Sequence, residues 1–173
     1  MCKVDYVQSG TNITNAGAIV DLTNIGQGDD ENARHGNSIY VRSVNWKGYI
    51  ARPVTGDAVQ IVRLVVLMDT QQIGDTAPTL NNVLESITPY AHLNSATVGR
   101  FKILCNKLIS LDTAKGLSQT FEINIPMRHH IRYNGTTGAD IQKGGLYIGF
   151  LSTQASTNYP VLYSECRMCY HDN

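Results

Sequence analysis

The stretch from Val62 to Met68 limits the possible folds more than any other part of this sequence, because it is apolar throughout except for Arg63. An apolar run of this length is typical of a strand that is covered on both faces, whereas a strand with one wet face alternates apolar and polar residues. We therefore expect a central strand over residues 58–69. Arg63 must then reach a partner or the end of the sheet.

Several other segments have the period of two that half-buried strands show. Between Ile39 and Ile50 the apolar positions change from odd to even numbers, which indicates a β-bulge near Arg42 and Ser43. A later strand contains Pro126, which we expect to interrupt its ladder of hydrogen bonds. We expect about eight strands in total, among them 39–50, 58–69, 100–111, 121–125, 144–151 and 159–170.

A single segment favours a helix. Residues Thr79–Glu85 follow Pro78, begin with a capping Thr and space their apolar residues three and four apart, which predicts a helix of about two turns near 79–86. A parallel α/β fold would need a helix after each strand, so the pattern favours an all-β sandwich or an eight-stranded antiparallel jelly roll with one short inserted helix. We expect residues 1–38 to form an extended N-terminal arm with one short strand, and 39–173 to form the jelly-roll domain.

The composition excludes several classes of protein. The 173 residues are 42% hydrophobic and only 16% charged, and 14 basic residues balance 14 acidic ones. A net charge of zero argues against an autonomous, strongly basic nucleic-acid binder, and the apolar content argues against a disordered chain. An average soluble domain is about 25% charged, so the deficit suggests a surface that is hidden against copies of the same chain. No apolar run is long enough to span a membrane, and the four cysteines are too sparse for a disulfide scaffold. We expect reduced thiols.

The sequence contains no pattern that indicates catalysis. No motif joins Cys105 to any of the five histidines, so we interpret this thiol as a small core residue. Cys166 and Cys169 form one pair where structural zinc sites use two, and on a strand they would point to opposite faces. We expect no enzymatic activity.

Acidic residues offer a candidate cation site. Asp29 and Asp30 follow a glycine-rich turn, and Asp69 ends the central strand. Hard cations such as Ca²⁺ take carboxylate and carbonyl oxygens, so Asp29, Asp30 and Asp69 are candidate calcium ligands, with Asp75 as a further one. Asp-rich turns without metal are the alternative. We expect no cofactor to be required.

The stretch from Arg100 to Arg132 is basic, with six Lys and Arg residues against two acids. It contains the adjacent His129 and His130, which could ligate a metal or bind phosphate, although a solvated basic loop is the favoured interpretation. Cations gathered on one surface neutralise phosphates without reading sequence. The candidate nucleic-acid contacts are Arg100, Lys102, Lys107, Arg128 and Arg132, and Lys115 is the sixth basic residue.

Four blocks of sequence, taken in order, resemble the coat proteins of satellite tobacco necrosis virus-like viruses and the capsid proteins of circular Rep-encoding single-stranded DNA viruses. Residues 25–39 resemble the approach to the first jelly-roll strand, and 62–69 resemble the second strand. Residues 75–84 resemble the inserted helix of that family, and 100–104 resemble its Arg-Phe-x-Ile-Leu strand. Weaker matches lie at 123–126, 133–135 and 149–151.

The resemblance implies a viral capsid protein with an eight-stranded jelly-roll shell domain. Such a protein self-assembles into an icosahedral shell of sixty copies or a multiple, of which T=1 is the smallest, around single-stranded viral nucleic acid. The resemblance also implies a place in the virion, assembly inside the host cell and calcium at subunit interfaces. Family members usually begin with a basic arm, which this sequence does not show, so we expect genome contact at the inner shell surface or at an arm ahead of Met1.

The resemblance places the strand that begins at Arg100 in the sheet nearest the shell interior. Arg100 and Lys102 would then face the lumen together, while Phe101, Ile103 and Cys105 fill the core. The alternative for Arg100 is that it caps the strand and forms a salt bridge between subunits. Two alternatives remain. A carbohydrate- or receptor-binding jelly roll would predict secretion and disulfides, and a cupin-like metalloenzyme would need a His-x-His motif.

Overall fold

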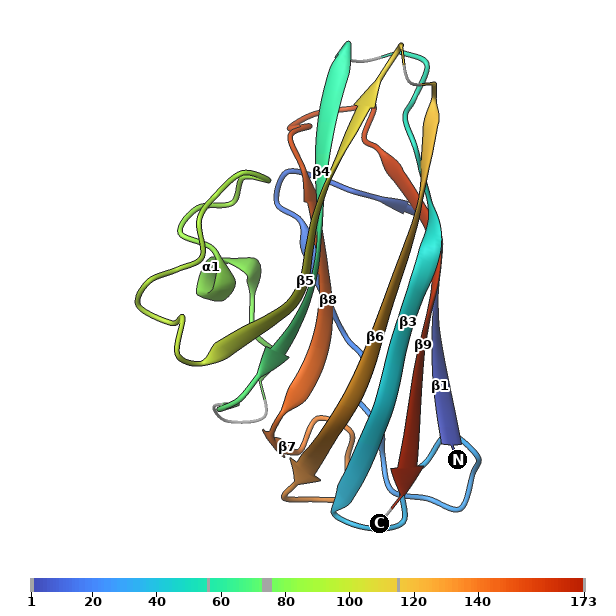
Figure 1. Cartoon of the computed structure of the whole chain (residues 1–173), viewed down its shortest axis with the longest axis vertical. Coiled ribbons are helices and arrows are strands. Elements are labelled where there is room, and N and C mark those ends of the chain that lie inside the picture. Colours follow the sequence, from blue (N-terminus) through green and yellow to red (C-terminus); the bar gives the residue numbers. More distant parts are fainter. Residues whose placement is uncertain (1, 56, 73–75, 115, 173) are drawn as a thin grey trace.

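The computed structural model describes residues 2–55, 57–72, 76–114 and 116–172 as two antiparallel sheets packed face to face (Figure 1). One sheet has five strands in the order β1-β9-β3-β6-β7, and the other has four in the order β2-β8-β4-β5. The elements are β1 (Cys2–Asn12), β2 (Ala18–Asp21), β3 (Ser38–Ala51), β4 (Val59–Asp69), α1 (Leu80–Val83), β5 (Phe101–Asp112), β6 (Ser118–Tyr133), β7 (Ile141–Lys143), β8 (Gly145–Ser152) and β9 (Val161–Asp172).

The strand pairing confirms the predicted jelly roll. The pairs β1–β9, β2–β8, β3–β6 and β4–β5 are nested, as in one long hairpin rolled into two sheets. The described residues form nine strands rather than about eight, because the short β7 pairs with the end of β6 just before β8 begins. Among these residues, no helix is long and apolar enough to cross a membrane.

The prediction for β4 is confirmed. This strand lies between β8 and β5, and the side chains from Val62 to Asp69 are all buried. Arg63 has the partners that its burial requires. Its Nε donates to Oδ1 of Asn106 at 2.9 Å, and its Nη1 donates to the carbonyl of Ala91 at 2.6 Å.

The predicted bulge in β3 is also confirmed, since the register with both β6 and β9 shifts between Val41 and Ser43. Pro126, in contrast, does not interrupt its ladder. β6 continues through Pro126 to Tyr133, and Pro126 pairs with Ser43 directly beside the bulge. At this position β6 has a described partner only on the β3 side, and proline is tolerated at such edges and bulges.

The first 38 residues contain two strands where one was expected. β1 pairs with β9 over its whole length, and β2 pairs with β8. The alternation of Cys2, Val4 and Tyr6 with polar residues turns these three side chains toward the core, a signal that the polar composition hid. The first two jelly-roll strands are therefore β1 and β2, so residues 25–39 lead into the third strand and 62–69 form the fourth. The division of the chain at residue 38 stays a prediction.

The molecule has two apolar clusters. The larger lies between the sheets and includes Trp46 and Tyr170, while a second lies outside the four-stranded sheet, where Leu80 and Leu84 of the α1 segment cover β4 and β8. The helix has four residues, one turn instead of about two, because Leu84 already has extended backbone angles. Its start at Thr79 was predicted correctly.

The expectation that Phe101, Ile103 and Cys105 share one face is wrong. Phe101 and Ile103 pack in the outer cluster, whereas Cys105 packs against the cluster between the sheets. The register of β5 with β4 shifts between the partners of Ile103 and Cys105, so a bulge at Leu104 reverses the alternation.

Candidate nucleic-acid interface

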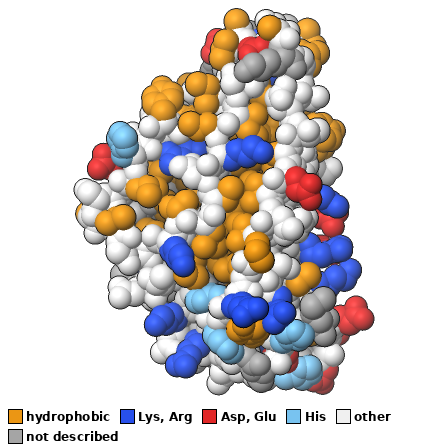
Figure 2. All heavy atoms as spheres, viewed as in Figure 1, with side chains coloured by type: hydrophobic (Ala, Val, Ile, Leu, Met, Phe, Trp, Pro, Cys, Tyr) orange, Lys and Arg blue, Asp and Glu red, His pale blue; other side chains and the backbone are white. Residues whose placement is uncertain are grey.

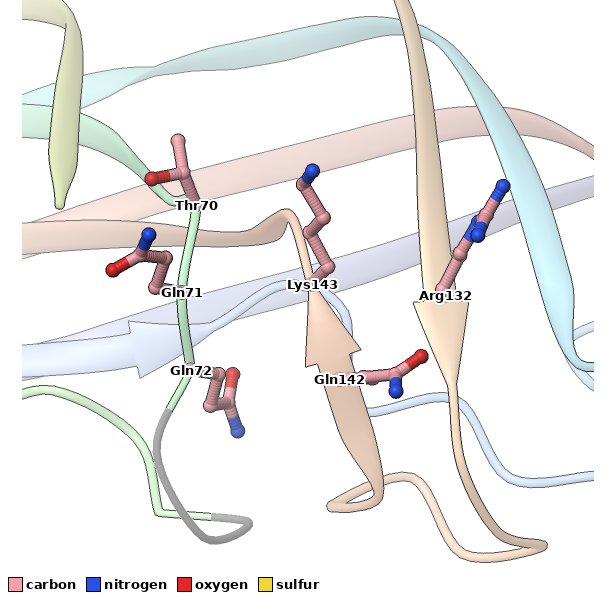
Figure 3. Close-up of a pocket in the computed structure, with 6 residues that line it drawn as sticks. All are labelled: Thr70, Gln71, Gln72, Arg132, Gln142 and Lys143. Carbon is pink, nitrogen blue, oxygen red and sulfur yellow. The ribbon is translucent and has the colours of Figure 1, made fainter.

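Three hollows lie in a row along the side of the sandwich where β5 and β6 face each other. The middle one, of about 420 Å³, is lined by residues 128–130, Arg132 and Lys143. It shares Arg132 and Lys143 with a hollow of about 450 Å³ that Thr70, Gln71 and Gln72 close on the far side (Figure 3). The third hollow, of about 200 Å³, continues to β5 and shares Arg128 and His129 with the middle one. Because neighbouring hollows share lining residues, we treat the three as one groove.

We call this feature the basic groove and define it by Lys102, Arg128, Arg132 and Lys143. Figure 2 shows Lys, Arg and His side chains gathered over the lower part of this face, while acidic side chains lie mostly toward its rim. Among the described residues that line the three hollows, none is acidic. None of the four cations forms an ion pair with a described residue.

The period of β6 explains why these cations gather. Ile131 and Tyr133 point into the core, so Arg128, His130 and Arg132 alternate with them and are exposed. β7 then pairs with the end of β6 so that Lys143 lies directly opposite Arg132. Like charges in a cross-strand pair are destabilising, and a bound anion would relieve this repulsion.

His129 responds to the same charges. Burial lowers the pKa of its imidazole, the positive charges of Lys102 and Lys143 lower it further, and the backbone of Gly144 acts in the opposite direction. The ring is therefore neutral at pH 7. It lines the groove as a polar, uncharged group, and the charge of the groove comes from Lys and Arg.

The structure brings together three of the five predicted contacts, namely Lys102, Arg128 and Arg132. Lys107 lies five residues further along β5, about 17 Å at the rise of an extended strand, and does not line the three hollows. Lys115 lies outside the described residues. Whether any of these side chains contacts nucleic acid stays a prediction.

Arg100 is placed differently from its expected partner Lys102. Its Nη2 lies 2.5 Å from Oδ2 of Asp69, and its Nε lies 2.9 Å from Oδ1. These bonds to the carboxylate raise the pKa of Arg100. The guanidinium is thus already neutralised within the chain.

The candidate calcium ligands do not converge. Asp69 is fully buried and held by Arg100 and by the backbone N–H of Gln71, so a cation there would have to displace Arg100. Asp29 and Asp30 are exposed on the loop between β2 and β3. Within the described residues, no group of three or more His, Cys, Asp or Glu side chains is placed to hold a metal ion. Asp75 lies outside those residues.

Lys143 was not among the nucleic-acid contacts that the sequence predicted. It is a single lysine in a polar segment, and only the pairing of β7 with β6 brings it to Arg132. The two residues are eleven positions apart in the sequence, and a charge count restricted to 100–132 could not include it.

Comparison with known proteins adds one finding. A family model described as Satellite tobacco necrosis virus coat protein matches residues 2–170, which is nearly the whole chain. No curated protein sequence matches it.

Proposed function

Since this chain belongs to the satellite tobacco necrosis virus coat protein family, we propose that its basic groove contacts the packaged genome inside an icosahedral shell. The protein is a viral capsid protein: it is part of the virion and assembles with other subunits around the viral genome. The family is structural, and its match favours the shell protein over a carbohydrate- or receptor-binding module.

One observation carries the role of the groove: four cations that form no ion pair with a described residue gather on one surface of a chain whose net charge is zero. Two other cations are neutralised within the chain, Arg100 by Asp69 and Arg167 by Asp5. A polyanion of repeating phosphates would supply the missing negative charge without any recognition of bases. We therefore propose sequence-independent binding.

Salt dependence tests this binding directly. Four contacts to a single strand predict a slope of about −3 for the logarithm of the association constant against the logarithm of the salt concentration. Each of the substitutions Arg128→Gln, Arg132→Gln and Lys143→Gln should reduce the steepness by about 0.7. Two oligonucleotides of unrelated sequence should bind equally tightly.

Lys47→Gln is the matched control. Lys47 is exposed on β3 and lies opposite Glu122 and Glu165, so its removal should leave the slope unchanged. Equal slopes for the wild type and the three groove variants would overturn the proposal.

We also propose that the shell contains sixty copies or a multiple and assembles inside the host cell. Particles recovered directly from expressing cells should appear isometric by negative-stain electron microscopy. A stable monomer at micromolar concentration and physiological salt would contradict this part of the proposal.

Calcium at subunit interfaces is a separate proposal that rests on Asp29 and Asp30. Buried Arg34 holds their loop in place by donating to the carbonyls of Ile25 and Gly36. Two carboxylates would need further oxygen ligands from a neighbouring subunit. Chelator at mildly alkaline pH should swell or dissociate the particles, and the variant with Asp29→Asn and Asp30→Asn should no longer respond. Particles that are indifferent to chelator would exclude the metal.

A further inference from the structure

A row of three rings crosses the outer face of the five-stranded sheet. Tyr40 on β3 pairs in register with His130 on β6 and with His171 on β9. The rings of Tyr40 and His130 have centroids 4.6 Å apart and are inclined at 51°. Both histidines are exposed, and Tyr40 between them is half-buried.

Three arginines surround this row. The guanidinium carbon of Arg42 lies 5.9 Å from the centre of the Tyr40 ring, within the range of a cation–π contact. Arg128 and Arg132 lie two residues before and after His130, so they share its face of β6. None of the three forms an ion pair with a described residue.

The other half of the same sheet face has a different character. There Arg167 is paired with Asp5 at 2.6 Å and with Glu165 at 3.3 Å, and Lys3 lies 3.7 Å from Asp5. Tyr49 and Tyr163 stack on each other with centroids 4.9 Å apart, and no arginine has a described cation–π contact with them. Among the described residues of this face, an arginine lies against a ring at the end that adjoins the basic groove, where Arg42 contacts Tyr40.

We propose that Tyr40, His130 and His171 form a stacking platform for bases of a single-stranded segment of the packaged genome. Arg42, Arg128 and Arg132 would hold the phosphates on either side. Surfaces that bind single strands combine aromatic rings with cations in this way, and stacking tolerates any sequence because every base has a flat face. The inference rests on the proposed function, since the same strand would continue into the basic groove. It requires the five-stranded sheet, rather than the sheet that contains β5, to face the shell interior.

The experiment compares two ligands for the purified full-length chain: a short oligothymidylate and an abasic oligonucleotide of the same length. Both carry the same phosphates, but only the first carries bases. The wild type should bind the oligothymidylate about tenfold more tightly than the abasic strand. This comparison needs no variant and therefore holds even if a substitution disturbs folding.

Substitutions then locate the effect. Tyr40→Val keeps a good strand former and should remove most of the tenfold preference while leaving abasic binding unchanged. Tyr40→Phe should retain the preference. Tyr163→Val is the matched control, because it removes a stacked ring from the other half of the same sheet face.

Three outcomes would overturn the platform. Equal binding of both ligands by the wild type would leave the groove as a phosphate site alone. If Tyr40→Val and Tyr163→Val reduce the preference for the oligothymidylate equally, the position of the ring on the sheet face does not matter. Poor assembly of Tyr40→Val with an unchanged base preference would indicate that a neighbouring subunit covers the surface. Failure of the wild type to bind either ligand at low salt would instead refute the proposed function itself.

Discussion

The two sheets differ in what covers their outer faces. In the four-stranded sheet, β8 is buried along its whole length and β4 along most of it, because the other sheet covers one face and the α1 segment covers the second. In the five-stranded sheet, β3, β6 and β9 alternate between buried and exposed residues. One sheet of the jelly roll is therefore buried on both faces, whereas the other keeps a polar outer face that is available to partners.

The largest effect on stability is expected in the outer apolar cluster, where the α1 segment packs against the four-stranded sheet. Leu84 is 1% exposed in the outer cluster. Leu84→Ala should lower the free energy of unfolding of unassembled subunits by about 3 kcal/mol, since it removes buried methyl groups and leaves a cavity. Leu108→Ala, at a position that is 56% exposed on β5, is the control. If Leu84→Ala and Leu108→Ala lower the free energy of unfolding equally in urea denaturation, the packing of the α1 segment on the four-stranded sheet does not contribute to stability.

The buried ion pair that ends β4 should be nearly as important. Arg100→Gln leaves the carboxylate of Asp69, which is 0% exposed, without its counter-charge, at a cost of about 3 kcal/mol. Asp69→Asn should cost less, because Arg100 is 17% exposed and can reach water. The double variant should recover part of the loss. A larger loss for Asp69→Asn than for Arg100→Gln in the same denaturation assay would contradict this asymmetry.

The two sheets also treat carboxylates differently. Burial raises the pKa of Asp21 on β2 to about 6, against hydrogen bonds from Thr23 that lower it. The folded state therefore holds the proton more tightly than the unfolded state, so stability falls as the pH rises from about 4 to about 6. Since the side chain is only partly buried, we expect a loss of about 2 kcal/mol across this window. Asp21→Asn should remove this fall in the free energy of unfolding between pH 4 and pH 6. If the wild type and Asp21→Asn show the same dependence of stability on pH, Asp21 is not the group that causes it.

The smallest effect is expected on the open face of the five-stranded sheet. The hydrogen bond from Arg167 lowers the pKa of Asp5, but the guanidinium is exposed to solvent. Surface ion pairs of this kind contribute little, so Arg167→Gln should leave the urea midpoint unchanged within error. A clear loss of stability would show that the open face contributes to folding as the covered face does.

The features that were predictable from the sequence are those that a local pattern encodes. The apolar run of β4 predicted a central strand, and the change of parity near Arg42 predicted the bulge. The ion pair between Arg100 and Asp69 was not predictable, because the two residues are 31 positions apart and meet only when β4 pairs with β5. Lys143 joined the groove through strand pairing in the same way. Arg128 and Arg132 share the period of β6, but the contribution of Lys143 depends on strand pairing and leaves no period in the sequence.

The nucleic-acid content of assembled particles tests the central claim most directly. Particles of the wild type, of the triple variant Arg128→Gln, Arg132→Gln and Lys143→Gln, and of the Lys47→Gln control would be purified from expressing cells, and phosphate would be measured per subunit. If the basic groove holds the genome, the triple variant should assemble normally and carry about half the nucleic acid or less, while the control matches the wild type. Triple-variant particles with the full nucleic-acid content would contradict the account.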